Sequence, residues 1–141
     1  MNTTLVIVEP KAHRRLRLVD GLRATHTIQP LTSIDGALRH IRVQRPGIVL
    51  IGVGRRTEPA LRLARQIKTD GGNQAFIGLI DWSGRLKDPQ ELARSCGANG
   101  IYIGEPSKDA LVAFVAKLME EEGVAIAGSA PIGIIGRLLK S

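Results

Sequence analysis

The sequence is poor in cysteine and in aromatic residues, and both shortages exclude kinds of protein. Cys96 is the only cysteine, so the chain has no internal disulfide, and a reducing compartment such as the cytoplasm fits it best. Two Phe, one Trp and one Tyr are too few for a platform on which nucleic-acid bases stack. The longest apolar runs fall short of the ~18 residues of a membrane span, and no signal peptide is recognisable at the N-terminus.

Catalytic and metal-binding motifs are missing as well. The chain has no Walker lysine motif, no Cys/His spacing suited to a metal and no Ser-His-Asp order. Without an acid-base pair or an activated nucleophile we expect no enzymatic activity, no cofactor and no bound metal.

Positive charge is concentrated in the first half of the chain. Residues 1–70 hold thirteen Lys/Arg and five Asp/Glu, a balance of +8, whereas residues 71–141 hold seven and eight, a balance of −1. Such a one-sided excess indicates a surface for an anionic partner, either an acidic protein or, more weakly, nucleic acid. A basic face that is simply solvated is the plainer interpretation, and both remain open.

Apolar runs of strand length alternate five times with segments of helical period. The second run carries Pro30 and is more polar, which is typical of an edge strand. Strand-helix alternation predicts parallel pairing through right-handed crossovers, and therefore a flavodoxin-like (βα)5 three-layer sandwich with strand order 2-1-3-4-5. The predicted strands are residues 5–8, 26–31, 48–51, 76–80 and 101–103, and the predicted helix N-caps are Ser33, Thr57, Asp88 and Ser107.

The last residues lie outside this alternation. We predict one domain over residues 1–122 and a separate tail over residues 123–141, which begins with glycines. A short basic amphipathic helix is expected in the tail, with Arg137 and Lys140 beside an apolar face of Ile132, Ile135, Leu138 and Leu139.

The layout and four local patterns resemble the response-regulator receiver (CheY-like) family. Residues 5–9 resemble its first strand, which ends in an acidic pair, and residues 45–51 resemble the third strand, which runs into the phosphoacceptor aspartate. Residues 97–102 are similar to the family's Gly-Ala-Asp-Gly-Tyr turn, and residues 105–106 to the Lys-Pro that follows. The resemblance covers roughly residues 4–122.

The chain departs from the family at the positions that carry its chemistry. The resemblance places Pro10 at the second acid, which ligates Mg²⁺, and Gly52 at the phosphoacceptor aspartate. Ile80 replaces a hydroxyl residue, and Gly104 or Glu105 replaces the lysine. Glycine has no nucleophile and proline no ligand for a hard cation. The implied, degenerate phosphorylation site is Glu9, Pro10, Gly52, Ile80, Gly104 and Glu105.

These departures predict a pseudo-receiver that is not phosphorylated and acts as a protein-interaction module in signalling. The family's usual meeting surface would run here from about Leu92 to Leu118 and could support a homodimer. Glu9 is expected to pair with Arg55 or Arg56. The alternative function is a sensor whose basic mouth binds an anion or a nucleotide phosphate, because loops after the first and third strands meet at the topological switch point. That mouth would contain Lys11, Arg14, Arg55 and Arg56.

Overall fold

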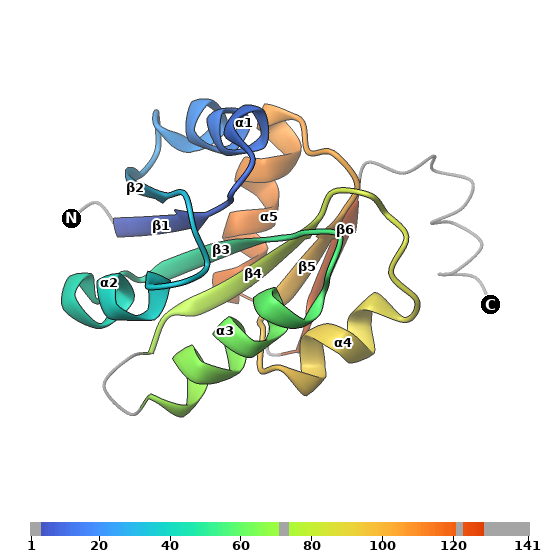
Figure 1. The fold of residues 1–141 in the computed structure, drawn as a ribbon. Helices are drawn as coiled ribbons and strands as arrows, with labels where there is room; N and C mark the ends of the chain where they lie inside the picture. Colours follow the sequence, from blue (N-terminus) through green and yellow to red (C-terminus); the bar gives the residue numbers. More distant parts are fainter. Residues whose placement is uncertain (1–3, 71–73, 121–122, 129–141) are drawn as a thin grey trace.

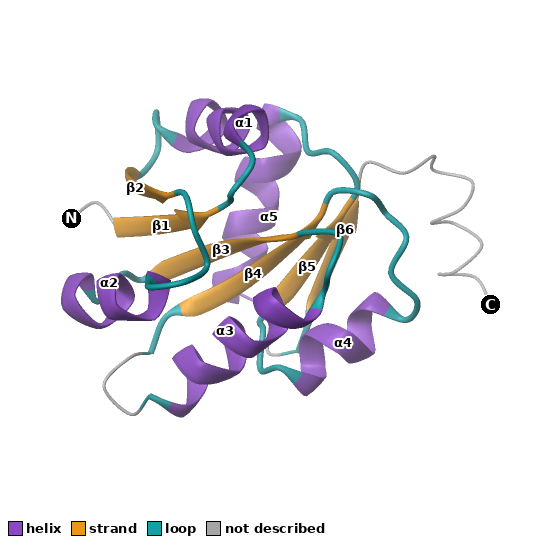
Figure 2. Cartoon of the chain, viewed as in Figure 1, coloured by secondary structure: helices purple, strands orange, loops and turns teal. Residues whose placement is uncertain are grey.

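The computed structural model describes residues 4–70, 74–120 and 123–128. These residues form a six-stranded parallel sheet with helices on both of its faces (Figures 1 and 2). The elements are β1 (Thr4–Val8), α1 (Ala12–Leu22), β2 (Thr27–Leu31), α2 (Ala37–Gln44), β3 (Ile48–Val53), α3 (Glu58–Thr69), β4 (Phe76–Asp81), α4 (Pro89–Ser95), β5 (Gly100–Ile103), α5 (Lys108–Glu120) and β6 (Ala125–Gly128).

The strand order is β2-β1-β3-β4-β5-β6, which confirms the predicted order of the first five strands and the flavodoxin-like fold. Every residue of β3 is buried, as expected of a central strand with helices on both faces. Strand β2 lies at an edge, where Pro30 pairs with Ile7 of β1. An edge strand tolerates a proline because one side of its backbone has no ladder hydrogen bonds to lose.

The sixth strand corrects the predicted domain boundary. Residues 125–128, assigned by sequence to a separate tail, pair in parallel with all of β5, from Gly100 opposite Ala125 to Ile103 opposite Gly128. The sheet therefore extends past residue 122. The predicted tail helix lies outside the described residues and stays a prediction. Within the described residues, no helix has the length and apolar character needed to cross a membrane.

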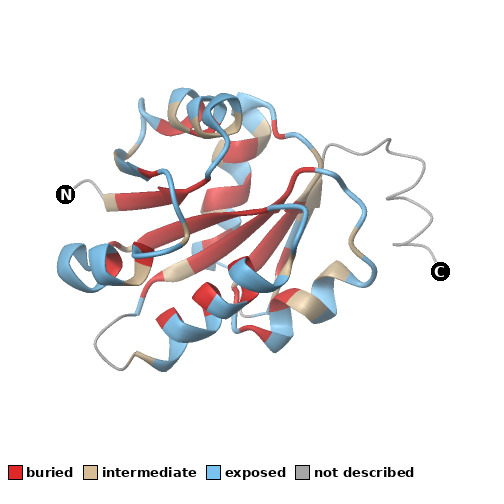
Figure 3. Ribbon diagram, in the orientation of Figure 1, coloured by how far each residue is buried: buried red, intermediate tan, exposed pale blue. Residues whose placement is uncertain are grey.

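Alternating side chains of the strands divide the core into two layers. Leu5, Ile7 and Leu50 face α1 and α5, whereas Val6 and Val8 point to the opposite face and pack with residues of α2, α3 and α4. Figure 3 shows the continuous band of buried residues along the strands and the exposed outer faces of the helices. Two covered faces explain why the strands read as continuous apolar runs.

Most helix starts fall where the sequence predicts them. Asp88 caps α4 by accepting a hydrogen bond from the Glu91 amide at 3.4 Å, and Ser107 accepts one from the Ala110 amide at 3.2 Å. The prediction that Ser33 is a helix N-cap is wrong. Its hydroxyl accepts from the amide of Asp35 in a turn, and α2 begins only after Gly36, whose φ of 80° lies outside the helical region.

Cys96 is buried, and its thiol donates to the carbonyl of Ala93 at 3.4 Å. Burial raises the pKa of this thiol, against smaller opposing effects of the Ala98 backbone hydrogen bond and of Arg65. Because the thiolate is the reactive form, we expect alkylation by iodoacetamide to be slow in the native protein and fast in urea. Mass spectrometry of timed aliquots measures this. Equal native and denatured rates would contradict it.

Candidate functional site

The carboxyl ends of the parallel strands meet at one edge of the sheet, and the predicted site lies there. This edge receives the residue after β1, the end of β3, the end of β4 and the loop after β5. Open α/β sheets bind ligands at this edge, next to the switch point between strands whose connections turn in opposite directions. In the order found here that point lies between β1 and β3.

Glu9 occupies the space that any side chain at position 52 would need. An ideal Cβ built on Gly52 would collide with the Oε1 atom of Glu9 and would lie 2.8 Å from its Cδ and 3.3 Å from Nε1 of Trp82. Glu9 is only 3% exposed. The backbone at the end of β3 is therefore covered directly by a carboxyl group delivered from the end of β1.

Hydrogen bonds hold Glu9 in this position. Its Oε2 accepts from the backbone amide of Lys11 at 2.9 Å, its amide donates to the carbonyl of Leu31 at 3.1 Å, and its carbonyl accepts from Nη1 of Arg15 at 2.8 Å. The predicted pairing with Arg55 or Arg56 is wrong. The carboxylate is instead satisfied locally, at the start of α1, because the short turn after β1 folds the Lys11 amide onto it.

The other residues of the degenerate site contribute no reactive group. Pro10 is exposed, and Ile80 is buried in the apolar layer beneath α1 and α5. The amide of Gly104 donates to the carbonyl of Asp81 at 2.8 Å. Glu105 pairs with Arg17 of α1 at 3.1 Å, and its side chain is 61% exposed. The described residues include no group of three or more His, Cys, Asp or Glu side chains that could hold a metal ion.

Asp81 organises the loop after β4, a role that the sequence did not indicate. The predicted strand stops at residue 80, whereas β4 ends with Asp81, which is buried. Its Oδ1 accepts from the Ser83 hydroxyl at 3.1 Å and from the Gly84 amide at 3.2 Å, and its Oδ2 accepts from the Leu86 amide at 3.3 Å. The carboxylate therefore fixes the loop that carries Arg85. An Asp followed two residues later by Ser, then Gly, is the signal that could have revealed this turn.

Trp82 is an internal packing residue at this edge. The side chain of Trp82 is only 8% exposed, so it packs inside the protein. The guanidinium carbon of Arg14 lies 5.4 Å from the centre of the indole ring, within the range of a cation–π contact. Within the described part of the chain, the indole Nε1 has no hydrogen-bond partner.

Three of the four predicted anion-binding residues line one cavity. This cavity, of about 470 Å³, is bordered by Lys11 and Arg14 at the start of α1 and by Arg55 after β3. The prediction that Arg56 belongs to this group is wrong, because Arg56 lines a different cavity, between α2 and α3. Arg85, which the sequence did not suggest, joins the first three from the loop after β4. We call the cavity lined by Lys11, Arg14, Arg55 and Arg85 the basic mouth.

Comparison with solved structures identifies the architecture. Chemotaxis response regulator CheY4 of Vibrio cholerae superposes with a TM-score of 0.74 at 11% identity, over 84% of this chain and 99% of that one. A response regulator from Thermotoga maritima gives 0.69 at 18% identity, over 86% and 100%. The chain has the receiver fold. The isolated receiver domain of RcsB from Salmonella enterica serovar Typhimurium, studied with phosphomimetic BeF₃⁻, gives 0.67 at 10% identity, over 87% and 92%.

Sequence comparison adds nothing to this structural likeness. No protein-family model and no curated protein sequence matches the chain. At sequence identities of 10–18%, the likeness to these three structures shows a shared fold and nothing more. The chain spans nearly the whole length of each of the three. What the chain does with the receiver fold has to be argued from its own residues.

Proposed function

We propose that this chain is a receiver-type signalling module that works without being phosphorylated, by binding a protein partner. The receiver fold and its presence in response regulators support the signalling role. A receiver offers helix and strand surfaces to its partners, and loss of the phosphoacceptor leaves those surfaces in place. We further propose that the module acts in the cytoplasm and is not an enzyme.

The observation that carries this proposal is the packing of Glu9 against Gly52. A phosphoacceptor at the end of β3 needs a side chain that reaches into solvent, and here position 52 has none. The buried Glu9 carboxyl covers the position instead. A hard divalent cation would need several oxygen ligands, whereas the nearby side chains that line the cavity include Lys11, Arg14 and Arg55.

The sixth strand changes which surface can meet a partner. In the sequence-based hypothesis β5 would stand at the sheet edge between α4 and α5, in a homodimer surface from Leu92 to Leu118. Here β6 takes the hydrogen bonds along that side of β5. A surface at this end therefore consists of α4, β6 and α5, and it includes the exposed apolar side chain of Ile126 in β6. A homodimer here remains one arrangement of the proposed module.

Treatment with acetyl phosphate and Mg²⁺ tests phosphorylation independence. We expect the intact mass to stay unchanged, because no carboxylate with metal ligands is free at the end of β3. A receiver domain that has the acidic pair, the aspartate and the lysine serves as a positive control in the same buffer. A stable, stoichiometric gain of one phosphoryl group would contradict the proposal. Complexes with a partner should form equally well with and without the treatment.

A further inference from the structure

We propose that the basic mouth binds a phosphorylated small molecule whose phosphate carries at least two negative charges. The inference goes beyond the proposed function, because it gives the module a ligand whose occupancy could replace phosphorylation as its signal. It stands on the geometry of the cavity and does not depend on the identity of a protein partner.

Four cations from three separate segments converge on the cavity. Lys11 and Arg14 come from the start of α1, Arg55 from the loop after β3, and Arg85 from the loop after β4. None of the four takes part in any ion pair found within residues 4–70, 74–120 and 123–128. Exposed arginines elsewhere do find partners, as Arg17 of α1 does with Glu105 and Arg65 of α3 with Glu58.

The carboxylates near the mouth serve to build it and leave the cations uncompensated. Asp81 lines the cavity, but its oxygens accept from Ser83, Gly84 and Leu86 and so shape the loop that holds Arg85. Glu9 lies beneath, with Oε2 accepting from the Lys11 amide. With both carboxylates counted against the four cations, the mouth has a net charge of +2. This charge creates a positive potential that attracts a dianion.

Two further features orient donors toward the cavity. Arg14 is stacked over Trp82, so its planar guanidinium is held at the wall. Thr57, which also lines the cavity, is the N-cap residue of α3, and within the described residues its hydroxyl makes no capping hydrogen bond. The first amides of a helix have no intrahelical acceptor, and the positive end of its dipole favours an anion.

The size of the cavity favours a larger ligand over an inorganic ion. A volume of about 470 Å³ lies within the ~300–1,000 Å³ typical of sites for small organic ligands and exceeds the need of one phosphate. Val53 and Leu86 supply apolar wall beside the cations. The guanidinium group of an arginine can donate to two phosphate oxygens at once. A diphosphate group attached to an organic moiety, as in a nucleoside diphosphate, therefore fits the cations of the basic mouth best.

Titration calorimetry of the full chain at low ionic strength tests the proposal, with ADP, inorganic diphosphate and inorganic phosphate as probes. We expect ADP to bind with micromolar affinity, diphosphate more weakly and single phosphate weakest. Tight diphosphate binding that the nucleoside does not improve would assign the mouth to the inorganic anion. The one tryptophan of the chain gives a second readout, because a ligand that draws Arg14 off the indole changes its fluorescence.

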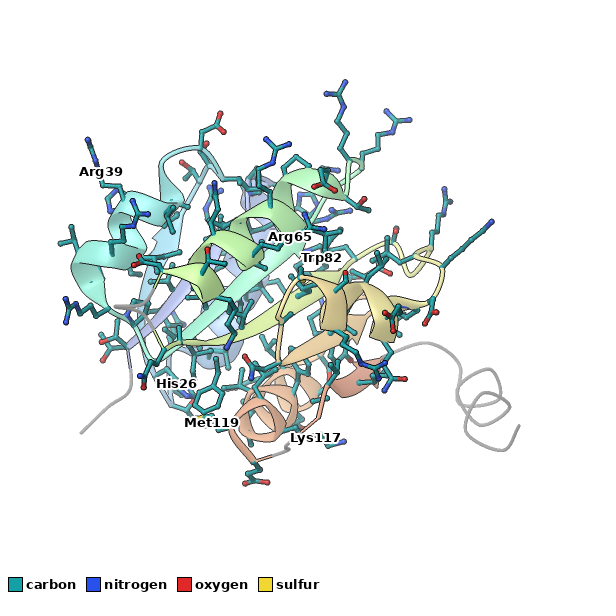
Figure 4. The ribbon with its side chains drawn as sticks, turned by 90° about the horizontal axis from the view of Figure 1, so that it is seen from below. His26, Arg39, Arg65, Trp82, Lys117 and Met119 are labelled. Atoms are coloured by element: carbon teal, nitrogen blue, oxygen red, sulfur yellow. The ribbon has the colours of Figure 1, made fainter. Side chains whose placement is uncertain are left out.

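Matched variants distinguish binding at a specific site from attraction by the overall positive charge of the protein. Arg55→Gln with Arg85→Gln removes two exposed, unpaired cations of the mouth, and affinity for ADP should fall on the order of tenfold for each, as for hydrogen bonds to a charged group. Arg45→Asn with Lys117→Gln removes the same charge elsewhere; Arg45 has φ 47°, which asparagine tolerates, and Figure 4 labels Lys117 on α5.

The outcomes distinguish this inference from the proposed function. Equal weakening by both pairs, or no binding of any probe to the original chain, overturns the phosphate site. Either result leaves the acetyl phosphate experiment unaffected, and a phosphorylated chain would leave the binding result standing. Unchanged thermal melting of the ligand-free variants shows that a lost affinity is not a lost fold.

Discussion

Replacing Gly52 by alanine should lower the free energy of unfolding by about 2 kcal/mol, the usual cost of overpacking a filled position. The new Cβ would collide with Oε1 of Glu9 and approach Nε1 of Trp82 to 3.3 Å. To make room, the carboxyl must leave a buried position and give up the hydrogen bond from the Lys11 amide. Urea denaturation followed by circular dichroism measures the loss.

A double-mutant cycle assigns that cost to Glu9. With Glu9→Ala already present, Gly52→Ala should cost less than about 0.5 kcal/mol, because the colliding carboxyl is gone and alanine restricts the unfolded chain more than glycine. Glu9→Gln serves as the matched control, since it removes the charge and keeps the shape. The cost of Gly52→Ala should persist in that background. Equal costs in all three backgrounds would show that Glu9 does not fill the space.

Removal of β6 should destabilise the protein by about 2 kcal/mol or more, since net contributions of ~1 kcal/mol per ladder hydrogen bond are lost with the burial of Ala125. A chain that ends at residue 122 loses β6, whereas a chain that ends at residue 128 keeps it. The comparison is matched, because both lack residues 129–141. We expect the shorter chain to melt roughly 10 °C lower.

The same pair of chains tests what β6 shields. Without it, the apolar strand β5 becomes an edge with unpaired backbone groups and no charge or proline to protect it. The chain ending at residue 122 should therefore associate at concentrations where the longer chain does not, which light scattering after gel filtration detects. If the two chains had identical melting temperatures and masses, β6 would be dispensable for the fold, and the domain boundary would lie at residue 122 as the sequence predicts.

Local physics explains which parts of the fold were predictable. The five strand-helix alternations, the edge position of the Pro30 strand and the caps at Asp88 and Ser107 follow from periodicity and from the chemistry of single residues. Strand β6 was not predicted because its four residues, AIAG, include one large apolar side chain, whereas the predicted strand at residues 101–103, IYI, has three. The conformation of β6 depends on the free edge of β5, against which it pairs. The prediction of an N-cap at Ser33 failed because the φ of Gly36, which delays the start of α2, is set by the whole turn.

At the strand ends, the sequence by itself determined what chemistry is missing, and the tertiary structure decided what replaces it. Pro10, Gly52 and Ile80 lack ligand, nucleophile and hydroxyl whatever their surroundings, because those are properties of the side chains. That Glu9 fills the place above Gly52, and that Arg85 rather than Arg56 joins the basic mouth, depends on turns that bring residues far apart in the chain to one cavity. Such turns are set by hydrogen bonds like those of Asp81, whose partners only the folded loop brings within reach.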